Sequence, residues 1–260
     1  MLLLKYICSW SGGKDSTASI ILAHEHNEPL DIILFSEVMF DKERNISGEN
    51  PRHIDFIKNV GKPLFESWGY KVEVLKADTD YLEHFNHIIE RPVKNLQYKG
   101  MKHGFPLNGR CGIKRDCKVK PIKKYLKELQ EPYRQYVGIA VDEPKRLESL
   151  YKDNSQISLL DKYGYTEEMA KELCKRYGLL SPCYELSKRG GCWFCMNAKL
   201  AEMREIKEMF PDTWKEFVRL EDENNVANHK WNVYGKSTLK EIDEQLEFEK
   251  QQMTIYDFIN

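Results

Sequence analysis

The feature that most constrains this chain is a short glycine turn near its start, Ser11-Gly12-Gly13-Lys14-Asp15-Ser16-Thr17. An apolar run precedes it and an apolar helical pattern, residues 18–23, follows it, so the sequence predicts a strand, a tight turn and a helix. Adjacent glycines can take positive φ and approach a ligand closely, and the unpaired amides of a first helical turn favour an anion. The hydroxyls of Ser11, Ser16 and Thr17 add further donors. We therefore predict a phosphate site here.

Two familiar phosphate loops are excluded by spacing. A Walker loop requires a glycine five residues before Gly-Lys and a Ser or Thr directly after it, but Cys8 and Asp15 occupy those positions. A dinucleotide fingerprint fails because no third glycine follows. The remaining pattern, Ser-Gly-Gly-x-Asp-Ser after the first strand, resembles the PP-loop of the ATP pyrophosphatase superfamily. That resemblance implies cleavage of ATP to AMP and pyrophosphate, usually to adenylate a substrate. An ordinary glycine turn capped by Asp15 is the alternative.

The segments after the turn alternate between helical and strand patterns. The expected elements are a helix over 16–26, a buried strand over 31–38, a helix over 50–68, a strand over 70–75 and a strand over 134–139. This order predicts an α/β fold, a mostly parallel sheet with helices on both faces, similar to the adenine nucleotide alpha hydrolases. Glu37, at the end of the second strand, is then expected beside the glycine turn as an adenine or ribose contact, or else at a solvated strand exit.

Charge is distributed unevenly along the chain. The net charge is only −1, yet residues 91–127 carry twelve Lys or Arg against the single acid Asp116, whereas residues 200–260 carry fourteen acids and eight bases. Because such a basic segment repels itself, we expect it to bind a polyanion: the triphosphate, with Lys118 and Lys120 in the ATP site, or a nucleic-acid backbone. A solvated basic helix face is the alternative.

A polar cluster, Asp142-Glu143-Pro144-Lys145-Arg146, follows the last predicted strand. Together with the glycine turn and the segment Cys111-x5-Cys117-Lys-x-Lys-Pro, it resembles the phosphoadenosine-phosphosulfate-reductase-like branch of the superfamily over roughly residues 1–200. The resemblance implies that Asp142 and Glu143 act through Mg²⁺ and that Arg146 contacts phosphate. The two carboxylates can equally cap the following helix. Reductases of this branch usually carry a degenerate glycine loop, so the complete loop of this chain favours ATP cleavage over reduction.

Seven cysteines, in a chain without a membrane-span pattern or a signal-peptide pattern, predict a cytoplasmic protein that uses thiols for metal binding or catalysis. Cys192-x-x-Cys195 follows two glycines and forms a knuckle pattern, and Cys183 lies nine residues upstream. A redox dithiol and buried apolar thiols are the alternatives. The spacing resembles that of DNA-phosphorothioation ATP pyrophosphatases, which implies a 4Fe-4S cluster, but their fourth cysteine is missing here. Cys111, Cys117 or Cys174 would complete the set, and Zn²⁺ is the alternative metal.

The last part of the chain, residues 199–260, is expected to be helical and acidic, after a nucleotide-binding domain over 1–180 and a cysteine segment over 181–198. Its tail, Gln252-Met253-Thr254-Ile255-Tyr256, resembles the short peptide by which bacterial replication proteins bind the sliding clamp. A tail packed on its own domain is the alternative.

These patterns together predict an ATP-dependent adenylating enzyme, with sulfur transfer as the expected second step. The predicted catalytic residues are Lys14, Asp15, Asp142, Glu143 and Arg146, and the predicted cofactors are ATP, Mg²⁺ and the cluster or zinc. A phosphoadenosine-phosphosulfate-type reductase and a zinc-stapled nucleotide or nucleic-acid binding module are the competing interpretations.

Overall fold

The computed structural model describes residues 4–106, 111–187, 190–232 and 237–259, with side chains up to residue 252. Its centre is a five-stranded sheet in the order β5-β2-β1-β7-β8, and every neighbouring pair of strands is parallel. The strands are β1 (Lys5–Trp10), β2 (Ile32–Glu37), β5 (Lys71–Lys76), β7 (Tyr133–Tyr136) and β8 (Gln156–Ile157). The predicted α/β class with a parallel sheet is therefore confirmed.

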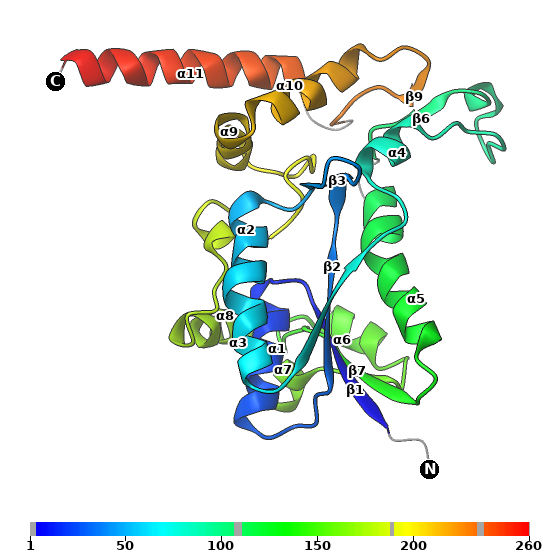
Figure 1. Ribbon diagram of the computed structural model, residues 1–260, viewed down its shortest axis with the longest axis vertical. Coiled ribbons are helices and arrows are strands. Elements are labelled where there is room, and N and C mark those ends of the chain that lie inside the picture. The colour runs from blue at the N-terminus through cyan, green and yellow to red at the C-terminus, as the bar shows by residue number, and fades with distance from the viewer. Residues whose placement is uncertain (1–3, 107–110, 188–189, 233–236, 260) are drawn as a thin grey trace.

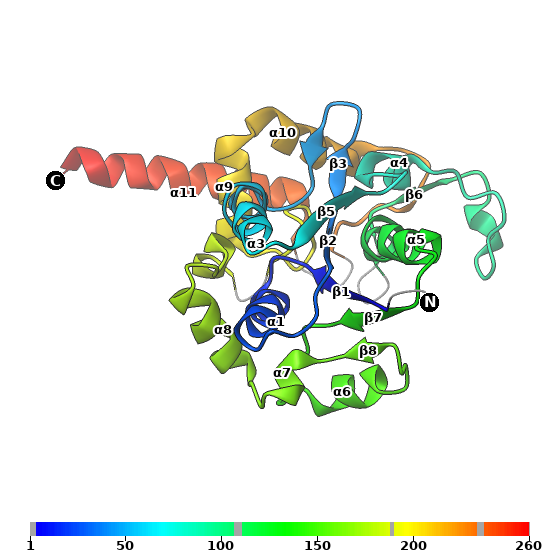
Figure 2. The same cartoon turned by 60° about the horizontal axis from the view of Figure 1, so that its bottom comes forward.

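Helices cover both faces of this sheet because the strand residues alternate between two apolar cores (Figure 2). On one face, Trp10 and Phe35 pack with α1 (Lys14–Glu25), α8 (Glu167–Arg176) and a long helix. That long helix runs from α2 (Pro51–Phe56) through a π-helical turn (Ile57–Gly61) into α3 (Lys62–Ser67). On the other face, Ile7 and Leu34 pack against α5 (Lys120–Glu128), which follows a second π-helical turn (Lys114–Val119).

The strand β8 lies at one edge of the sheet, and two short helices flank it. These are α6 (Pro144–Leu150) and α7 (Leu159–Lys162). Proline at the start of α6 fits a first helical turn, and the Ser158 side chain caps α7 by accepting the Asp161 backbone N–H at 3.1 Å. The chain then passes through α8 and a 3₁₀ turn (Pro182–Glu185) to the cysteine segment.

A second apolar core lies beyond the carboxyl ends of the strands (Figure 1). It joins Phe40, Tyr81 and Phe105 to Trp193 of the cysteine segment and Trp214 of the C-terminal helices. The elements here are β3 (Met39–Asp41), β4 (Ile46–Ser47), α4 (Tyr81–Asn86), β6 (Lys102–Gly104), α9 (Leu200–Met209), α10 (Pro211–Arg219), β9 (Val226–Asn228) and α11 (Leu239–Ile259), with 3₁₀ turns at Leu96–Tyr98 and Leu220–Asp222. The second core thus combines segments from both sides of the predicted boundary at residue 180.

The basic segment, residues 91–127, includes the strand β6, which pairs in parallel with β9. Residues 107–110 lie outside the described part of the chain. The backbone of the predicted clamp peptide, residues 252–256, continues α11, which projects away from the sheet (Figure 1). Its side chains from 253 onward are outside the description, so the clamp contact stays a prediction. Within the described residues, no helix is both long and apolar enough to cross a bilayer.

Candidate functional site

The glycine turn between β1 and α1 has the expected shape with one correction. Gly12 has φ +71°, the left-handed region that favours glycine. Gly13 has φ −75° and ψ 159°, an extended conformation open to any residue, so the prediction of positive φ at both glycines was wrong for Gly13. A β-carbon on Gly12 would lie 2.4 Å from Ile57 Cδ1 and 2.5 Å from His53 Cε1. Gly12 is therefore required both for the turn and for its packing on α2.

Serine hydroxyls hold the turn, and the N-cap residue of α1 is Gly13, which has no side chain to cap the helix. The backbone N–H of Ser11 donates to Ser16 Oγ at 3.1 Å, and Ser16 Oγ–H donates to the Gly13 carbonyl at 3.1 Å. Of the N–H groups in the first turn of α1, that of Lys14 donates to the Tyr184 hydroxyl oxygen. The positive dipole end of a helix N-terminus favours a bound anion.

A second close backbone approach comes from the end of β7. A β-carbon on Gly138 would lie 2.5 Å from the Asp15 carbonyl carbon and 2.5 Å from the Ser16 nitrogen. Only glycine leaves room for the strand to pass the first turn of α1 at this distance. The position also brings the residues after β7 next to the glycine turn, as expected at the carboxyl edge of a parallel sheet.

These elements enclose a cavity of about 220 Å³. Six of the residues predicted for the ATP site line it: Ser11, Gly13, Asp15, Ser16, Lys118 and Arg146. Six further lining residues were not predicted: Glu49, His53, Gly138, Tyr184, Gly190 and Gly191. The structure thus brings the glycine turn, the basic segment, the end of β7 and the cysteine segment to one place.

Several predicted site residues lie outside the lining of this cavity. Lys14 Nζ pairs with Asp15 at 2.8 Å and with Glu167 at 3.3 Å. Thr17 is fully buried, and its hydroxyl oxygen accepts the Trp10 indole N–H at 2.9 Å, so it supports the core. Glu37 is buried at the end of β2, where it pairs with Lys58 at 3.0 Å. Lys120 is exposed on α5 and lines a separate groove.

The three charged residues after β7, Asp142, Glu143 and Arg146, make different contacts. Arg146 faces the cavity and also donates to Glu143. The Glu143 carboxylate accepts the Ala140 backbone N–H at 3.3 Å. Asp142 accepts the backbone N–H of Glu167 at 3.1 Å, so it binds the start of α8. Of the two carboxylates predicted to place Mg²⁺, neither lines the cavity; the carboxylates that do are Asp15 and Glu49.

His53 connects the glycine turn to the segment before the cysteines. Its Nε2 lies 2.9 Å from the Ser11 carbonyl oxygen and its Nδ1 lies 2.8 Å from Ser181 Oγ. Burial lowers the pKa of His53, so the neutral imidazole is favoured, with Nε2–H donating to Ser11 and Nδ1 accepting from Ser181. Tyr184 adds a second link, because its hydroxyl oxygen accepts the Lys14 backbone N–H at 2.9 Å.

A buried ion pair forms another wall of the cavity. Glu49 is 1% exposed, and its Oε1 lies 2.8 Å from Lys118 Nζ. Burial lowers the pKa of the Lys118 ammonium, but the Glu49 carboxylate together with Cys192 and Cys195 raises it by more in total, so Lys118 stays charged. Glu49 directly precedes the Asn50-Pro51 start of α2. A sequence argument that placed the whole connection after β2 at the carboxyl edge of the sheet would have included it.

The cysteine segment is held against this wall by backbone pairing. The Asn50 N–H donates to the Gly191 carbonyl at 3.3 Å, and the Trp193 N–H donates to the Gly48 carbonyl at 3.0 Å. Glu49 and Cys192 form the antiparallel bridge between these two bonds. The two glycines before the knuckle, Gly190 and Gly191, therefore line the cavity in addition to allowing the turn.

The thiols do not group as their spacing suggests. Cys183 Sγ lies 3.2 Å from Ser181 Oγ and 3.7 Å from His53 Nδ1, and burial raises its pKa to about 11. Burial also raises the pKa of Cys192, which Lys118 lowers and which Glu49, Cys195 and Cys111 raise further. Among the described residues, no three His, Cys, Asp or Glu side chains are arranged to hold a metal ion. The predicted ligand set, including Cys117, is therefore not preassembled.

Three of these thiols affect the pKa of the Tyr81 hydroxyl. Burial raises the pKa of its hydroxyl, and Cys111, Cys195 and Cys192 raise it further. Its hydroxyl oxygen is buried and has no hydrogen-bond partner in the described part of the chain. Cys117 instead faces the Thr79 carbonyl at 3.4 Å. The Cys111, Cys192 and Cys195 thiols thus all act on the Tyr81 hydroxyl, and Cys111 also acts on Cys117.

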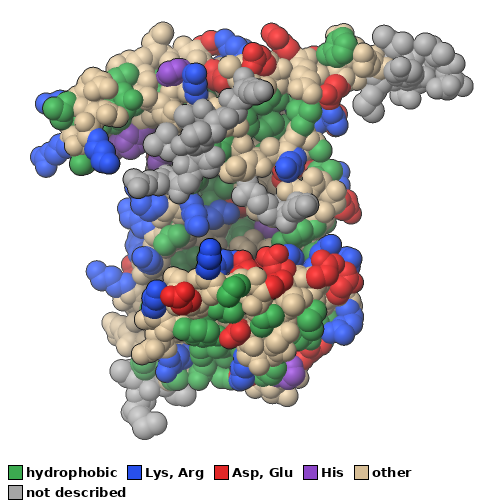
Figure 3. Space-filling model, turned by 180° about the vertical axis from the view of Figure 1, so that it is seen from behind, with side chains coloured by type: hydrophobic (Ala, Val, Ile, Leu, Met, Phe, Trp, Pro, Cys, Tyr) green, Lys and Arg blue, Asp and Glu red, His purple; other side chains and the backbone are tan. Residues whose placement is uncertain are grey.

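Lysines of α5 form a basic groove apart from the cavity. The groove has a volume of about 480 Å³, and its cationic lining residues are Lys76 of β5 and Lys120, Lys123, Lys124 and Lys127 of α5. Lys124 pairs with Asp78 at 3.6 Å. In the space-filling view, Lys and Arg side chains gather on one side of the hollow between the sheet and the C-terminal helices (Figure 3). Polyanion binding by residues 91–127 is compatible with this placement and stays a prediction.

Curated relatives resemble this chain at moderate distance. The chain is 25% identical over 227 residues to an uncharacterized protein of Methanocaldococcus jannaschii, MJ0973, covering 81% of this chain and 46% of that protein. It is 26% identical over 175 residues to a second uncharacterized protein of the same organism, MJ0066, covering 62% of this chain and 36% of that protein. The chain therefore spans less than half the length of each relative.

A comparison with solved structures finds a distant likeness to the U34-tRNA thiolase NcsA of Methanococcus maripaludis, whose structure contains a 4Fe-4S cluster. The TM-score is 0.40 and the identity is 14%, over 94% of this chain and 72% of that one. A likeness at this level carries no information about activity. No protein-family model matches the chain.

Proposed function

We propose that this chain is an ATP pyrophosphatase that adenylates a substrate, with sulfur transfer as the step that adenylation prepares. One observation carries the proposal: the N-terminus of α1, two serine hydroxyls and two cationic side chains converge on a single cavity. Each of these groups favours phosphate oxygens, and the glycine turn permits close approach. The pattern Ser11-Gly12-Gly13-x-Asp15-Ser16 adds the resemblance to the PP-loop.

The first step forms one bond and breaks one. A substrate oxygen attacks the α-phosphorus of ATP, and pyrophosphate leaves with the electron pair of the broken P–O bond. The amides at the start of α1 and the side chains of Ser11 and Ser16 hold the leaving phosphates. Arg146 and Lys118 stabilise the charge that develops on them. In the second step a sulfide sulfur attacks the activated centre, and AMP leaves.

Mg²⁺ would join this site through few protein ligands. The ion is usually bound by phosphate oxygens, waters and one or two carboxylates, and it supplies charge neutralisation at the phosphates. Asp15 and Glu49 are the carboxylates that line the cavity. Burial raises the pKa of Asp15, and the Lys14 hydrogen bond opposes that shift. A bound cation would favour the ionised form further.

We propose Cys111, Cys192 and Cys195 as the ligands of a 4Fe-4S cluster, with zinc as the alternative. The influence of Cys111 and Cys195 on the Cys192 thiol, and of all three thiols on the buried Tyr81 hydroxyl, supports this set, whereas Cys183 contacts Ser181 and His53. A 4Fe-4S cluster needs thiolate ligands, whereas a structural zinc site prefers four protein ligands. The chain would have to close slightly around either group, since the present positions do not form a metal site.

Cysteine variants should separate the two possible ligand sets. Protein purified without oxygen is expected to contain about four irons and four sulfides per chain. The Cys111→Ser and Cys192→Ser variants should each lose most of this metal, because each removes one of three sulfurs, whereas Cys183→Ser should keep it. Metal and sulfide analysis checks the result. Loss of metal in Cys183→Ser with retention in Cys111→Ser would favour the ligand set that includes Cys183. A content of one zinc per chain would show that the site binds zinc and not a cluster.

The proposed function itself is tested by the products of ATP turnover. Release of AMP and pyrophosphate supports it, because a reductase of an adenylylated sulfate releases no pyrophosphate and a binding module turns over no ATP.

A further inference from the structure

The Tyr184 side chain lines the candidate ATP cavity, and its hydroxyl group lies at the glycine turn. The hydroxyl oxygen accepts the Lys14 backbone N–H at 2.9 Å. A β-carbon on Gly13 would lie 3.3 Å from this oxygen and 3.2 Å from Ser11 Oγ, so two hydroxyl groups flank the same point of the turn. Tyr184 therefore contributes a polar group at the place where we expect the phosphates of ATP.

A phenol hydroxyl can accept one hydrogen bond and donate another, and the Tyr184 hydroxyl makes only the first of these contacts. Among the residues that the structure describes, no group accepts the Tyr184 O–H. The side chain is partly buried, and polar hydrogens in such a position are normally paired with protein, water or ligand. The O–H is therefore available to an acceptor oxygen of a ligand in the cavity.

The 3₁₀ turn at Pro182–Glu185 fixes the position of the phenol ring. The Tyr184 N–H donates to the Ser181 carbonyl at 3.1 Å, and Ser181 Oγ lies 2.8 Å from His53 Nδ1. Ser181 and His53 are both buried, and His53 Nε2 lies 2.9 Å from the Ser11 carbonyl oxygen. The 3₁₀ turn is thus connected to the glycine turn twice, through His53 and through the phenol. A hydroxyl group held in this way loses little freedom when it binds a phosphate.

The Tyr184 hydroxyl stays protonated in the neutral pH range, so it can donate to an anion. Burial raises the pKa of Tyr184, the Lys14 N–H opposes this shift, and the Asp15 carboxylate raises the pKa further. The Lys14 N–H belongs to the first turn of α1, at the positive end of the helix dipole. A hydrogen bond accepted from this N–H polarises the O–H and strengthens it as a donor.

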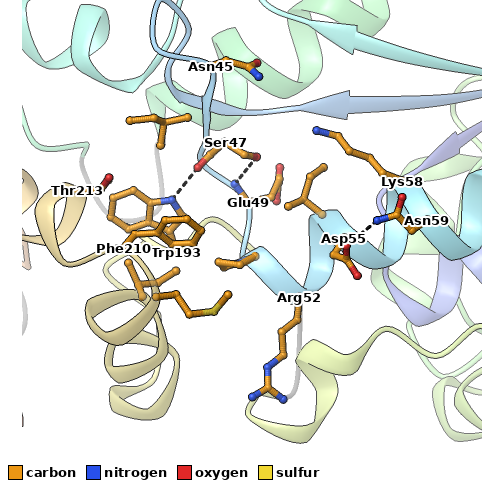
Figure 4. Close-up of a pocket in the computed structure, with 15 residues that line it drawn as sticks. Asn45, Ser47, Glu49, Arg52, Asp55, Lys58, Asn59, Trp193, Phe210 and Thr213 are labelled. Carbon is orange, nitrogen blue, oxygen red and sulfur yellow. Dashed lines mark hydrogen bonds between the residues drawn. The ribbon is translucent and has the colours of Figure 1, made fainter.

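Tyr184 faces the glycine turn and not the larger groove beside the cavity. That groove, of about 630 Å³, runs between the start of α2 and the helices α9 and α10 (Figure 4). Of the described residues that line the cavity, only Glu49 also lines the groove. The Tyr184 hydroxyl is therefore available to a ligand group at the glycine turn, which is the expected phosphate end of the site.

We propose that Tyr184 is a phosphate-binding residue, which donates its O–H to an oxygen of the pyrophosphate part of ATP while its oxygen accepts the Lys14 N–H. The inference rests on the proposed function, because it assigns the β- and γ-phosphates to the glycine turn. Negative charge develops on the pyrophosphate as it leaves, and the hydrogen bond from Tyr184 strengthens with that charge. The proton stays on Tyr184 throughout. AMP lacks these phosphates and does not reach the hydroxyl.

The Tyr184→Phe variant tests this assignment with pyrophosphate, a probe that requires no turnover of ATP. In calorimetric titrations of the full chain with Mg²⁺ present, the pyrophosphate affinity should fall at least about 10-fold, the effect of one hydrogen bond to a charged group, and the AMP affinity should not change. A purely structural role predicts the opposite, because the variant frees the Lys14 N–H for phosphate. Tyr177→Phe is the matched control, since its hydroxyl donates to Glu25 at 2.9 Å, outside the cavity.

A Tyr184→3-fluorotyrosine variant provides a second measurement that keeps the ring and the hydroxyl. Fluorine makes the hydroxyl a stronger donor and a weaker acceptor, so the pyrophosphate affinity at neutral pH should rise, and the absence of a rise overturns the donor role. Release of AMP and pyrophosphate from ATP, with equal pyrophosphate affinity in wild type and Tyr184→Phe, overturns this inference alone. Equal losses of AMP and pyrophosphate affinity also overturn it. Pyrophosphate binding that depends on Tyr184, in a chain that does not cleave ATP, instead overturns the adenylation function and leaves Tyr184 as an anion-binding residue.

Discussion

Replacing Gly12 by alanine should abolish ATP binding, while the same replacement at Gly164 should leave it intact. Both glycines have φ +71°, so both variants carry a similar backbone strain of about 1–2 kcal/mol. They differ in surroundings. A β-carbon on Gly164 meets nothing within 4 Å, whereas one on Gly12 meets Ile57 and His53 at 2.4 and 2.5 Å. The Gly12 variant must therefore shift His53, which is bound to the Ser11 carbonyl, and distort the phosphate turn.

Calorimetric titration with ATP and thermal unfolding of both variants check this prediction. We expect the ATP affinity of Gly12→Ala to fall at least about 100-fold, since the distortion reaches most of the phosphate donors at once. The backbone strain should lower the thermal stability of both variants by comparable amounts, and the clash should lower that of Gly12→Ala further. Wild-type ATP affinity in a folded Gly12→Ala variant would contradict the assignment of this turn as the phosphate site.

Replacing Lys118 by methionine should lower kcat/KM for ATP by about 100-fold or more, and replacing Lys120 should not. The two lysines are two residues apart in the same basic segment, but only Lys118 lines the cavity and pairs with Glu49. Lys120 is exposed at a separate groove. A cation fixed beside the transferring phosphates stabilises the transition state by a few kcal/mol, whereas an exposed one at a distance is screened by solvent and salt.

Loss of Lys118 also leaves the Glu49 carboxylate buried without its cation, which can cost about 3–5 kcal/mol of stability. Lys118→Arg and the double variant Lys118→Met/Glu49→Gln therefore accompany the test. The arginine variant retains the charge and should recover part of the activity. The double variant should recover stability without activity. Steady-state kinetics and chemical unfolding separate the effects, and equal kcat/KM in Lys118→Met and Lys120→Met would contradict the placement of Lys118.

Local patterns of apolar residues were sufficient for four strands of the sheet and for the helices after β1 and β2, but not for the edge strand β8. The runs that became β1 and β2 are continuous and apolar, and Asn50-Pro51 marks the start of α2 because asparagine caps and proline fits the first turn. The glycine turn was likewise predicted from neighbouring residues alone. Gly13 was misjudged because the sequence does not show which of two adjacent glycines takes the positive φ.

The other parts of the site depend on contacts between distant segments, which no local pattern encodes. Glu49 and His53 enter the cavity because Gly48–Asn50 pairs with Gly191–Trp193, about 140 residues later in the chain. Asp142 was predicted at the nucleotide, but the unpaired N–H at the start of α8 competes for its carboxylate. Cys183 fits a metal spacing, yet the 3₁₀ turn at Pro182–Glu185 directs its thiol to Ser181 and His53.

The identity of the products formed from ATP tests the central claim most directly. ATP labelled at the α-phosphate in one sample and at the γ-phosphate in another, incubated with Mg²⁺ and the full chain, should give labelled AMP and labelled pyrophosphate in equal amounts. Gly12→Ala serves as the inactive control. The account predicts cleavage only between the α- and β-phosphorus atoms. ADP with labelled inorganic phosphate, or equal product formation by wild type and Gly12→Ala, would contradict it.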